Sequence, residues 1–143
     1  MKEQPFNLLS YLNLFLDSQF PVLNAQQLEE LLSTIEKEVH SMHDFLSNLV
    51  NTRLWKSWQI QANPYQSKIL DIGLEIDRIA LDHIAPAYHS KKHMMDVCLM
   101  LSYILMQEES NQSDTLNNSP WRTSSTEKWQ LLLAAAAHDL GHP

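Results

Sequence analysis

The chain has 143 residues, of which 44% are hydrophobic and 19% are charged, so a disordered or collagen-like protein is excluded. It has only two glycines, Gly73 and Gly141, which excludes the glycine-rich phosphate-binding loops and disfavours a turn-rich β-sandwich. The formal net charge is −7 and the longest Lys/Arg cluster is Lys91-Lys92, so we expect no nucleic-acid partner.

Six prolines divide the sequence into stretches that indicate helices, and an all-α fold is expected. The first expected helix covers about residues 6–18. Polar residues interrupt its apolar run and no small-residue cleavage site follows, so neither a signal peptide nor a membrane span is expected. We therefore expect a cytoplasmic protein.

The second expected helix begins after Asn24, which suits the N-cap, and Gln27 can complete a capping box. Its apolar residues repeat every seven positions over residues 25–49, a pattern compatible with a coiled coil that joins two chains in a homodimer. Leu31 and Phe45 widen the apolar stripe, which favours a helix packed inside a bundle. Both interpretations stay open.

Three further helices are expected towards the C-terminal end, at about residues 66–84, 91–108 and 126–139. A polar loop from Glu109 to Ser125 separates the last two of these. The only cysteine, Cys98, rules out a disulfide within the chain, and its apolar surroundings predict a buried small side chain.

His89 and His93 flank the expected start of the 91–108 helix, for which Ser90 is a suitable N-cap. Two imidazoles four residues apart can point into one cavity. One of them can bind a metal ion while the other donates a proton. This spacing also occurs by chance, so the pair alone is a weak indication of function.

A second group of candidate ligands follows the alanine run at residues 134–137, which allows close approach of a neighbouring helix. His138 and Asp139 come next and can share one metal ion, and a buried unpaired carboxylate would need a cation or hydrogen-bond donors. Gly141 suits the helix C-cap, and His142 can turn back towards the site. We predict a metal site here, with a solvent-exposed helix end as the alternative.

Together the two elements resemble a known family. Residues 89–97 resemble the H-N-x-x-H-x-x-D-V element of class I cyclic-nucleotide phosphodiesterases, a branch of the HD metal-dependent phosphohydrolases. Residues 138–143 resemble the H-D-x-x-H-P element of the same family, and the resemblance covers about residues 78–143. Ser90 stands where the family usually has Asn, and Gly141 where many members have Asp.

The resemblance implies a helical bundle of the HD/phosphodiesterase type with two divalent metals, typically zinc with magnesium or manganese. His93, His138 and Asp139 would bind the tightly held metal, and Asp139 would bridge to the second. A metal-activated hydroxide would attack the phosphorus of cAMP or cGMP, and His89 would protonate the leaving 3′ oxygen. The other implied residues are Tyr88 in substrate binding, and His142 and Asp96, which would orient the metal ligands.

We divide the chain into N-terminal helices at residues 1–60 and the N-terminal part of a catalytic domain at residues 61–143. In the family, a further Asp ligand and the base-binding pocket lie downstream of the position of Pro143. We therefore expect a bundle that is incomplete at its C-terminus, with incomplete substrate recognition and with the choice between cAMP and cGMP open. The alternatives are another HD-type phosphohydrolase of nucleotides or phosphate esters, and a non-catalytic helical interaction module.

Overall fold

The structure is a computed structural model that describes residues 6–17, 24–82, 86–111 and 123–138. No strand occurs in these ranges, so the predicted all-α fold is confirmed. They contain the helices α1 (Leu8–Phe15), α2 (Ala25–Glu38), α3 (Met42–Val50), α4 (Arg53–Ser57), α5 (Pro64–Asp82), α6 (Pro86–Asn111) and α7 (Ser125–Ala137).

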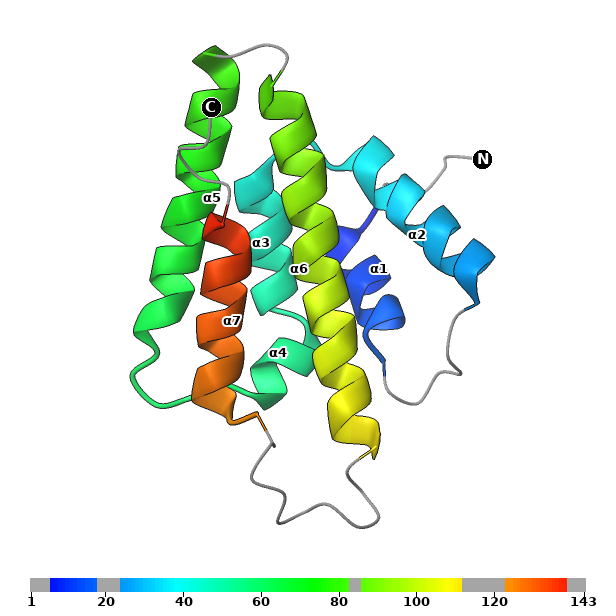
Figure 1. Ribbon diagram of the computed structural model, residues 1–143, viewed down its shortest axis with the longest axis vertical. Coiled ribbons are helices and arrows are strands. Elements are labelled where there is room, and N and C mark those ends of the chain that lie inside the picture. The colour runs from blue at the N-terminus through cyan, green and yellow to red at the C-terminus, as the bar shows by residue number, and fades with distance from the viewer. Residues whose placement is uncertain (1–5, 18–23, 83–85, 112–122, 139–143) are drawn as a thin grey trace.

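Helices α3, α5, α6 and α7 pack together, with α5 at one edge of the molecule (Figure 1). Helix α1 packs on α3 and α2 packs on α6, on the side away from α5. In that view α7, coloured orange to red, lies between α5 and α6 and contacts both. One buried cluster joins residues from both sides of the division predicted at residue 60. Its fully buried members include one residue from each helix: Leu12, Ile35, Phe45, Trp55, Ile69, Leu99 and Leu132.

None of the helices in the described ranges combines the length and the apolar character needed to cross a bilayer. The predicted burial of Cys98 is confirmed, since its side chain in α6 is fully buried. Burial raises the pKa of this thiol to about 12. Cys98 is therefore a packing residue and not a reactive thiol.

The predicted continuous helix over residues 25–49 is wrong. Helix α2 ends at Glu38 and α3 begins at Met42, because Val39 and Ser41 both have extended backbone dihedral angles. Val39 and Met42 are buried in the chain's own core, so the seven-residue repeat continues across a bend. A break in the helix removes the long straight seam that a coiled-coil dimer needs, and it favours the bundle interpretation.

The predicted capping box at the start of α2 is confirmed. Asn24 accepts a hydrogen bond from the Gln27 backbone N–H at 2.8 Å, and the Gln27 side chain accepts from the Asn24 N–H at 3.0 Å. Ser124 and Glu127 form a second capping box at the start of α7. Both α2 and α7 therefore begin at residues that local sequence specifies.

The predicted start of the 91–108 helix is wrong. Helix α6 begins at Pro86, a residue type that suits the first turn because its ring fixes φ and it lacks only an N–H that would be unpaired. Ser90 therefore lies inside α6 and is not its N-cap. The short helix α4 was not predicted from the sequence.

Tryptophans fix α4 and α7 to the rest of the fold. Trp55 of α4 donates a hydrogen bond to the Ser102 hydroxyl of α6 at 2.9 Å, and its ring centroid lies 5.1 Å from that of Trp129 in α7. Trp129 donates to the Trp58 carbonyl at 2.8 Å, and Trp58 donates to Glu109 of α6 at 2.6 Å. All three indole N–H groups are thus satisfied while their rings add to the core.

Gly73 permits the close packing of α3 against α5. A Cβ atom at this position would lie 2.8 Å from the Cα atom of His43 and 3.1 Å from its backbone nitrogen. Backbone atoms cannot move aside as the end of a flexible side chain can. Only glycine therefore fits at this crossing.

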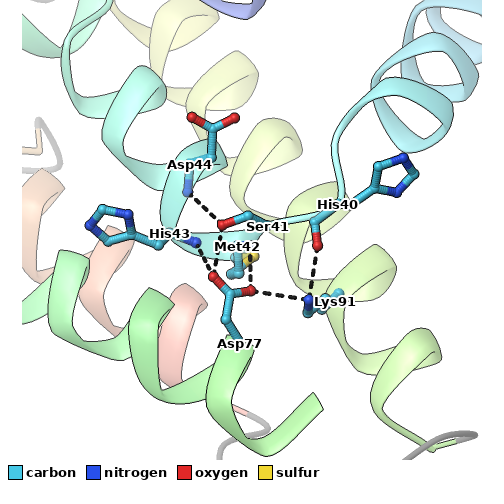
Figure 2. Close-up of polar contacts among 7 residues, drawn as sticks. All are labelled: His40, Ser41, Met42, His43, Asp44, Asp77 and Lys91. Atoms are coloured by element: carbon cyan, nitrogen blue, oxygen red, sulfur yellow. Dashed lines mark hydrogen bonds and ion pairs between the residues drawn. The ribbon is translucent and has the colours of Figure 1, made fainter. Parts of the chain in front are cut away.

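Asp77 lies on α5 one helical turn after Gly73, and its carboxylate caps the N-terminus of α3 (Figure 2). It accepts hydrogen bonds from the Met42 N–H at 2.7 Å, the His43 N–H at 3.0 Å and the Ser41 hydroxyl at 2.8 Å. The first N–H groups of a helix have no partner within the helix, and they carry its positive dipole end. Asp77 thus stabilises the start of α3 from a different helix.

Lys91 of α6 extends this cluster to a third helix (Figure 2). Its ammonium group lies 3.1 Å from the Asp77 carboxylate and donates a hydrogen bond to the His40 carbonyl at 2.8 Å. Burial by itself would raise the pKa of Asp77, but the hydrogen bonds from backbone, hydroxyl and ammonium donors outweigh it and lower the pKa. The carboxylate is therefore ionised in the folded protein.

Gly73→Ala is expected to destabilise the fold by about 1–3 kcal/mol, because the added Cβ atom overlaps the α3 backbone. At an open helix position the same change would stabilise by up to about 1 kcal/mol. Urea unfolding measures the free energy, with the exposed Lys68→Ala as the control on the same helix. A stabilising effect of Gly73→Ala would contradict the proposed close contact.

Asp77→Asn is expected to cost about 2 kcal/mol of unfolding free energy at pH 7, since a charged acceptor of several hydrogen bonds is lost. The folded-state pKa of Asp77 is lowered, so its stabilisation is present above about pH 4 and is lost as the pH falls through that pKa. The difference between wild type and variant should therefore shrink on acidification. Asp71→Asn, an exposed site on α5, is the control, and an equal loss there would refute the role of Asp77.

Candidate metal centre

Helices α6 and α7 bring two of the predicted metal ligands together. His93 lies on α6, His138 follows the last residue of α7, and the centroids of their rings are 5.2 Å apart at an interplanar angle of 64°. Both side chains are exposed. Residues far apart in sequence thus form one histidine pair at a solvent-accessible edge of the α6–α7 packing.

The ring of His138 is oriented by its own helix end. Its Nδ1 atom lies 2.6 Å from the Ala135 carbonyl oxygen. A carbonyl oxygen can only accept, so Nδ1 carries the proton and the lone pair of a neutral ring is on Nε2. Metal-binding histidines commonly hold a backbone carbonyl in this way, because the contact fixes the tautomer and the ring direction.

The spacing of the two rings fits a shared metal ion. Two imidazoles bound to one zinc ion through bonds of about 2.1 Å at a tetrahedral angle have centroids about 5 Å apart. His93 and His138 lie at this separation. Within residues 6–17, 24–82, 86–111 and 123–138, no group of three or more His, Cys, Asp or Glu side chains could hold a metal ion.

The other predicted site residues are only partly described. Tyr88 and His89 belong to the first turns of α6, so the prediction that His89 lies just outside a helix is wrong. His89 and His93 are about one helical turn apart in the same helix. Asp139 and His142 lie outside the described residues, and so do the side chains of Tyr88 and His89.

Asp96, predicted to orient the metal ligands, lies on α6 one turn beyond Lys92 and faces Glu36 of α2. Its Oδ1 atom is buried and accepts no hydrogen bond from the described part of the chain. Burial, followed by the charge and the hydrogen bonding of Glu36, raises the pKa of Asp96 to about 6, while Lys92 and His93 act to lower it. The Asp96 carboxyl therefore keeps its proton to a higher pH than an exposed Asp does.

Glu36 and Lys92 are parts of this site that were not predicted from the sequence. Their charged groups lie 3.1 Å apart and join α2 to α6. The four-residue spacing of Lys92 and Asp96 on one helix is the sequence signal that indicates Lys92. No local signal marks Glu36, because its partners lie on another helix.

The all-α fold, with histidines from two packed helices brought together, is consistent with the helical bundle that the resemblance implies. Residues 88–143 match the family model described as 3′5′-cyclic nucleotide phosphodiesterase. This match confirms the resemblance to that family for residues 88–143, which make up less than half of the chain. Searches of curated proteins and of solved structures find no match to the chain.

Asp96→Asn is expected to stabilise the fold above pH 6, by about 1 kcal/mol or less because the group is partly exposed. The folded-state pKa of about 6 exceeds the unfolded value of about 3.9, so the folded state binds more protons between these values. Stability contributed by Asp96 therefore falls as the pH rises from about 4 to about 6.

Thermal unfolding of wild type and Asp96→Asn across pH 4–8 measures this effect. The variant should lose part of the pH dependence and should differ little from wild type near pH 4. Asp71→Asn, at an exposed site, is the control and should keep the wild-type slope. Equal slopes for wild type and Asp96→Asn would show that the pKa of Asp96 is not raised in the folded protein.

Proposed function

We propose that this protein hydrolyses the 3′ phosphodiester bond of a cyclic nucleotide, cAMP or cGMP, to give the 5′-monophosphate, and that the reaction depends on two divalent metal ions. The observation that carries the proposal is the contact between the rings of His93 and His138. Each histidine belongs to one of the two sequence elements within the segment that matches the phosphodiesterase family.

His93, His138 and Asp139 would hold the tightly bound metal, zinc by the nature of its imidazole and carboxylate donors. A second ion, magnesium or manganese, would share Asp139. When bound, such ions stabilise the developing charge on a phosphoryl group and lower the pKa of a water molecule. The Nδ1–H contact of His138 with Ala135 supports this assignment, because it leaves Nε2 as the ligating atom.

His89 would act as the general acid. As its imidazolium loses a proton to the 3′ oxygen, the P–O3′ bond breaks while an oxygen derived from water forms the new bond to phosphorus. The products are a 5′-monophosphate and a free 3′ hydroxyl group. The position of His89 one turn before His93 on α6 supports this role, since both would then serve one site.

The charge balance around the site supports the need for metal ions. A cyclic nucleotide is an anion, and the chain carries a formal net charge of −7. The two lysines beside His93 are engaged by carboxylates, Lys91 by Asp77 and Lys92 by Glu36. Positive charge for the phosphate would therefore come from bound cations and not from the basic pair.

A phosphodiesterase assay with cAMP and cGMP, with added zinc and magnesium, tests the proposal on the 143-residue chain and on a version extended past Pro143. His138→Ala is expected to lower both bound zinc and turnover by about 100-fold or more, since a metal ligand is lost. His89→Asn is expected to lower turnover by about 100-fold or more while zinc binding stays unchanged.

The exposed His40→Asn is the matched control and should keep both activity and zinc. Absence of turnover by either version, together with absence of bound metal, would overturn the enzyme proposal and favour a helical interaction module. Hydrolysis of simple phosphate esters but not of cyclic nucleotides would instead support a different HD-type phosphohydrolase.

A further inference from the structure

Three consecutive residues of α6 contact three different parts of the fold. Lys91 lies 3.1 Å from Asp77 of α5 and donates to the His40 carbonyl ahead of α3 (Figure 2). Lys92 lies 3.1 Å from Glu36 of α2. The ring of His93 meets the ring of His138 at the end of α7.

Successive residues of an α-helix point about 100° apart around its axis. Contacts from three neighbouring positions therefore hold the helix on three sides, and they oppose rotation about its axis more effectively than contacts along one stripe. The two lysines are the longest run of basic residues in the chain. The proposed phosphodiesterase reaction assigns no role to these two lysines, and no nucleic-acid partner is expected that would bind them.

The Lys91–Asp77 pair is better shielded than an ordinary surface pair, and the Lys92–Glu36 pair is shielded on its acidic side only. The side chains of Lys91 and Asp77 are 21% and 22% exposed, whereas those of Lys92 and Glu36 are 47% and 19% exposed. By comparison, Arg78 and Glu75, which pair within α5, are 61% and 43% exposed. Partial burial reduces the screening of charge by water, so the Lys91–Asp77 pair resists displacement of α6 more than a surface pair would. The half-exposed Lys92 adds a weaker contact with the shielded carboxylate of Glu36.

A metal site is sensitive to this kind of displacement. A rotation of α6 by about 20° moves a side-chain group about 6 Å from the helix axis by about 2 Å. Metal–ligand distances tolerate only about 0.2 Å. The angular position of α6 therefore decides whether the rings of His93 and His138 can bind one ion.

We infer that Lys91 and Lys92 are positioning residues for the histidine pair. By holding α6 against Asp77 and Glu36, they set the angle at which His93 faces His138. The consequence for metal binding rests on the proposed function, whereas the arrangement of the two rings can be measured without any metal.

Lys91→Met and Lys92→Met test the inference, because methionine keeps an apolar stem and the helix propensity while it removes the ammonium group with its charge and hydrogen-bond donors. Two quantities are measured on the full chain. One is the nuclear Overhauser effect between the ring protons of His93 and His138 without metal, and the other is the affinity for Co²⁺ from its visible absorption. Each variant should weaken the ring-to-ring effect at least twofold and lower the Co²⁺ affinity at least tenfold.

Conservative and control variants separate positioning from loss of stability. Lys91→Arg and Lys92→Arg keep the cation and should restore both readouts to within twofold of wild type. Arg78→Met removes a cation beside Asp77 and should change neither readout. Val50→Ala removes buried apolar contacts at the far end of α3, so it should lower stability while the rings and the Co²⁺ affinity stay unchanged.

Wild-type readouts in both methionine variants would overturn the inference, and so would an equal loss in Val50→Ala. If a methionine variant fails to fold, Glu36→Gln tests the same contact from α2 and should reproduce the effect expected of Lys92→Met. If wild type shows the ring-to-ring effect and binds no Co²⁺, the proposed metal site fails, while the effect in the variants still decides the positioning role.

Discussion

The fold depends on the partly buried carboxylate of Asp77. Placing a charge there costs solvation energy, and the cost is offset because Ser41, Met42, His43 and Lys91 all donate to the same group. These donors belong to α3, the residue before it and α6, while Asp77 belongs to α5. One ionised side chain thus fixes three helices, and Gly73 makes this possible by letting α3 approach the α5 backbone.

This cluster lies beside the half of α6 that carries the candidate site. Lys91 ends in the Asp77 cluster, and two residues later His93 meets His138. The far half of α6 is held differently, by the hydrogen bonds of Trp55 to Ser102 and of Trp58 to Glu109. A long helix is therefore fixed by charge near the histidines and by aromatic packing away from them. A charged contact can be removed with little loss of core volume, so stability has to be measured beside the site in each variant.

The electrostatics of the site follow from the same contacts. Both lysines beside His93 are paired with acids, and Asp96 shares its surroundings with Glu36, so the described part of the site offers no excess of protein positive charge. A phosphodiester substrate is an anion that must be stabilised as charge develops on it. Metal ions held by histidine and aspartate would supply what the acidic chain does not.

The sequence by itself determined the features that arise from neighbouring residues. Apolar periodicity and proline spacing predicted an all-α fold, and Asn24 and Gln27 predicted the start of α2. The resemblance of the two histidine elements to a known family implied that His93 and His138 lie together. The bend between α2 and α3 has one local signal, the Ser41 N-cap, whose hydroxyl accepts a hydrogen bond from the Asp44 N–H at 3.1 Å. Only the tertiary structure decided that Asp77, more than 30 residues away, also holds Ser41 and Met42. The pairing of Glu36 with Lys92 and Asp96 was decided in the same way. Helix propensity and caps act within a few residues and leave a local pattern, whereas a carboxylate that bonds across helices acquires its partners only when the chain has folded.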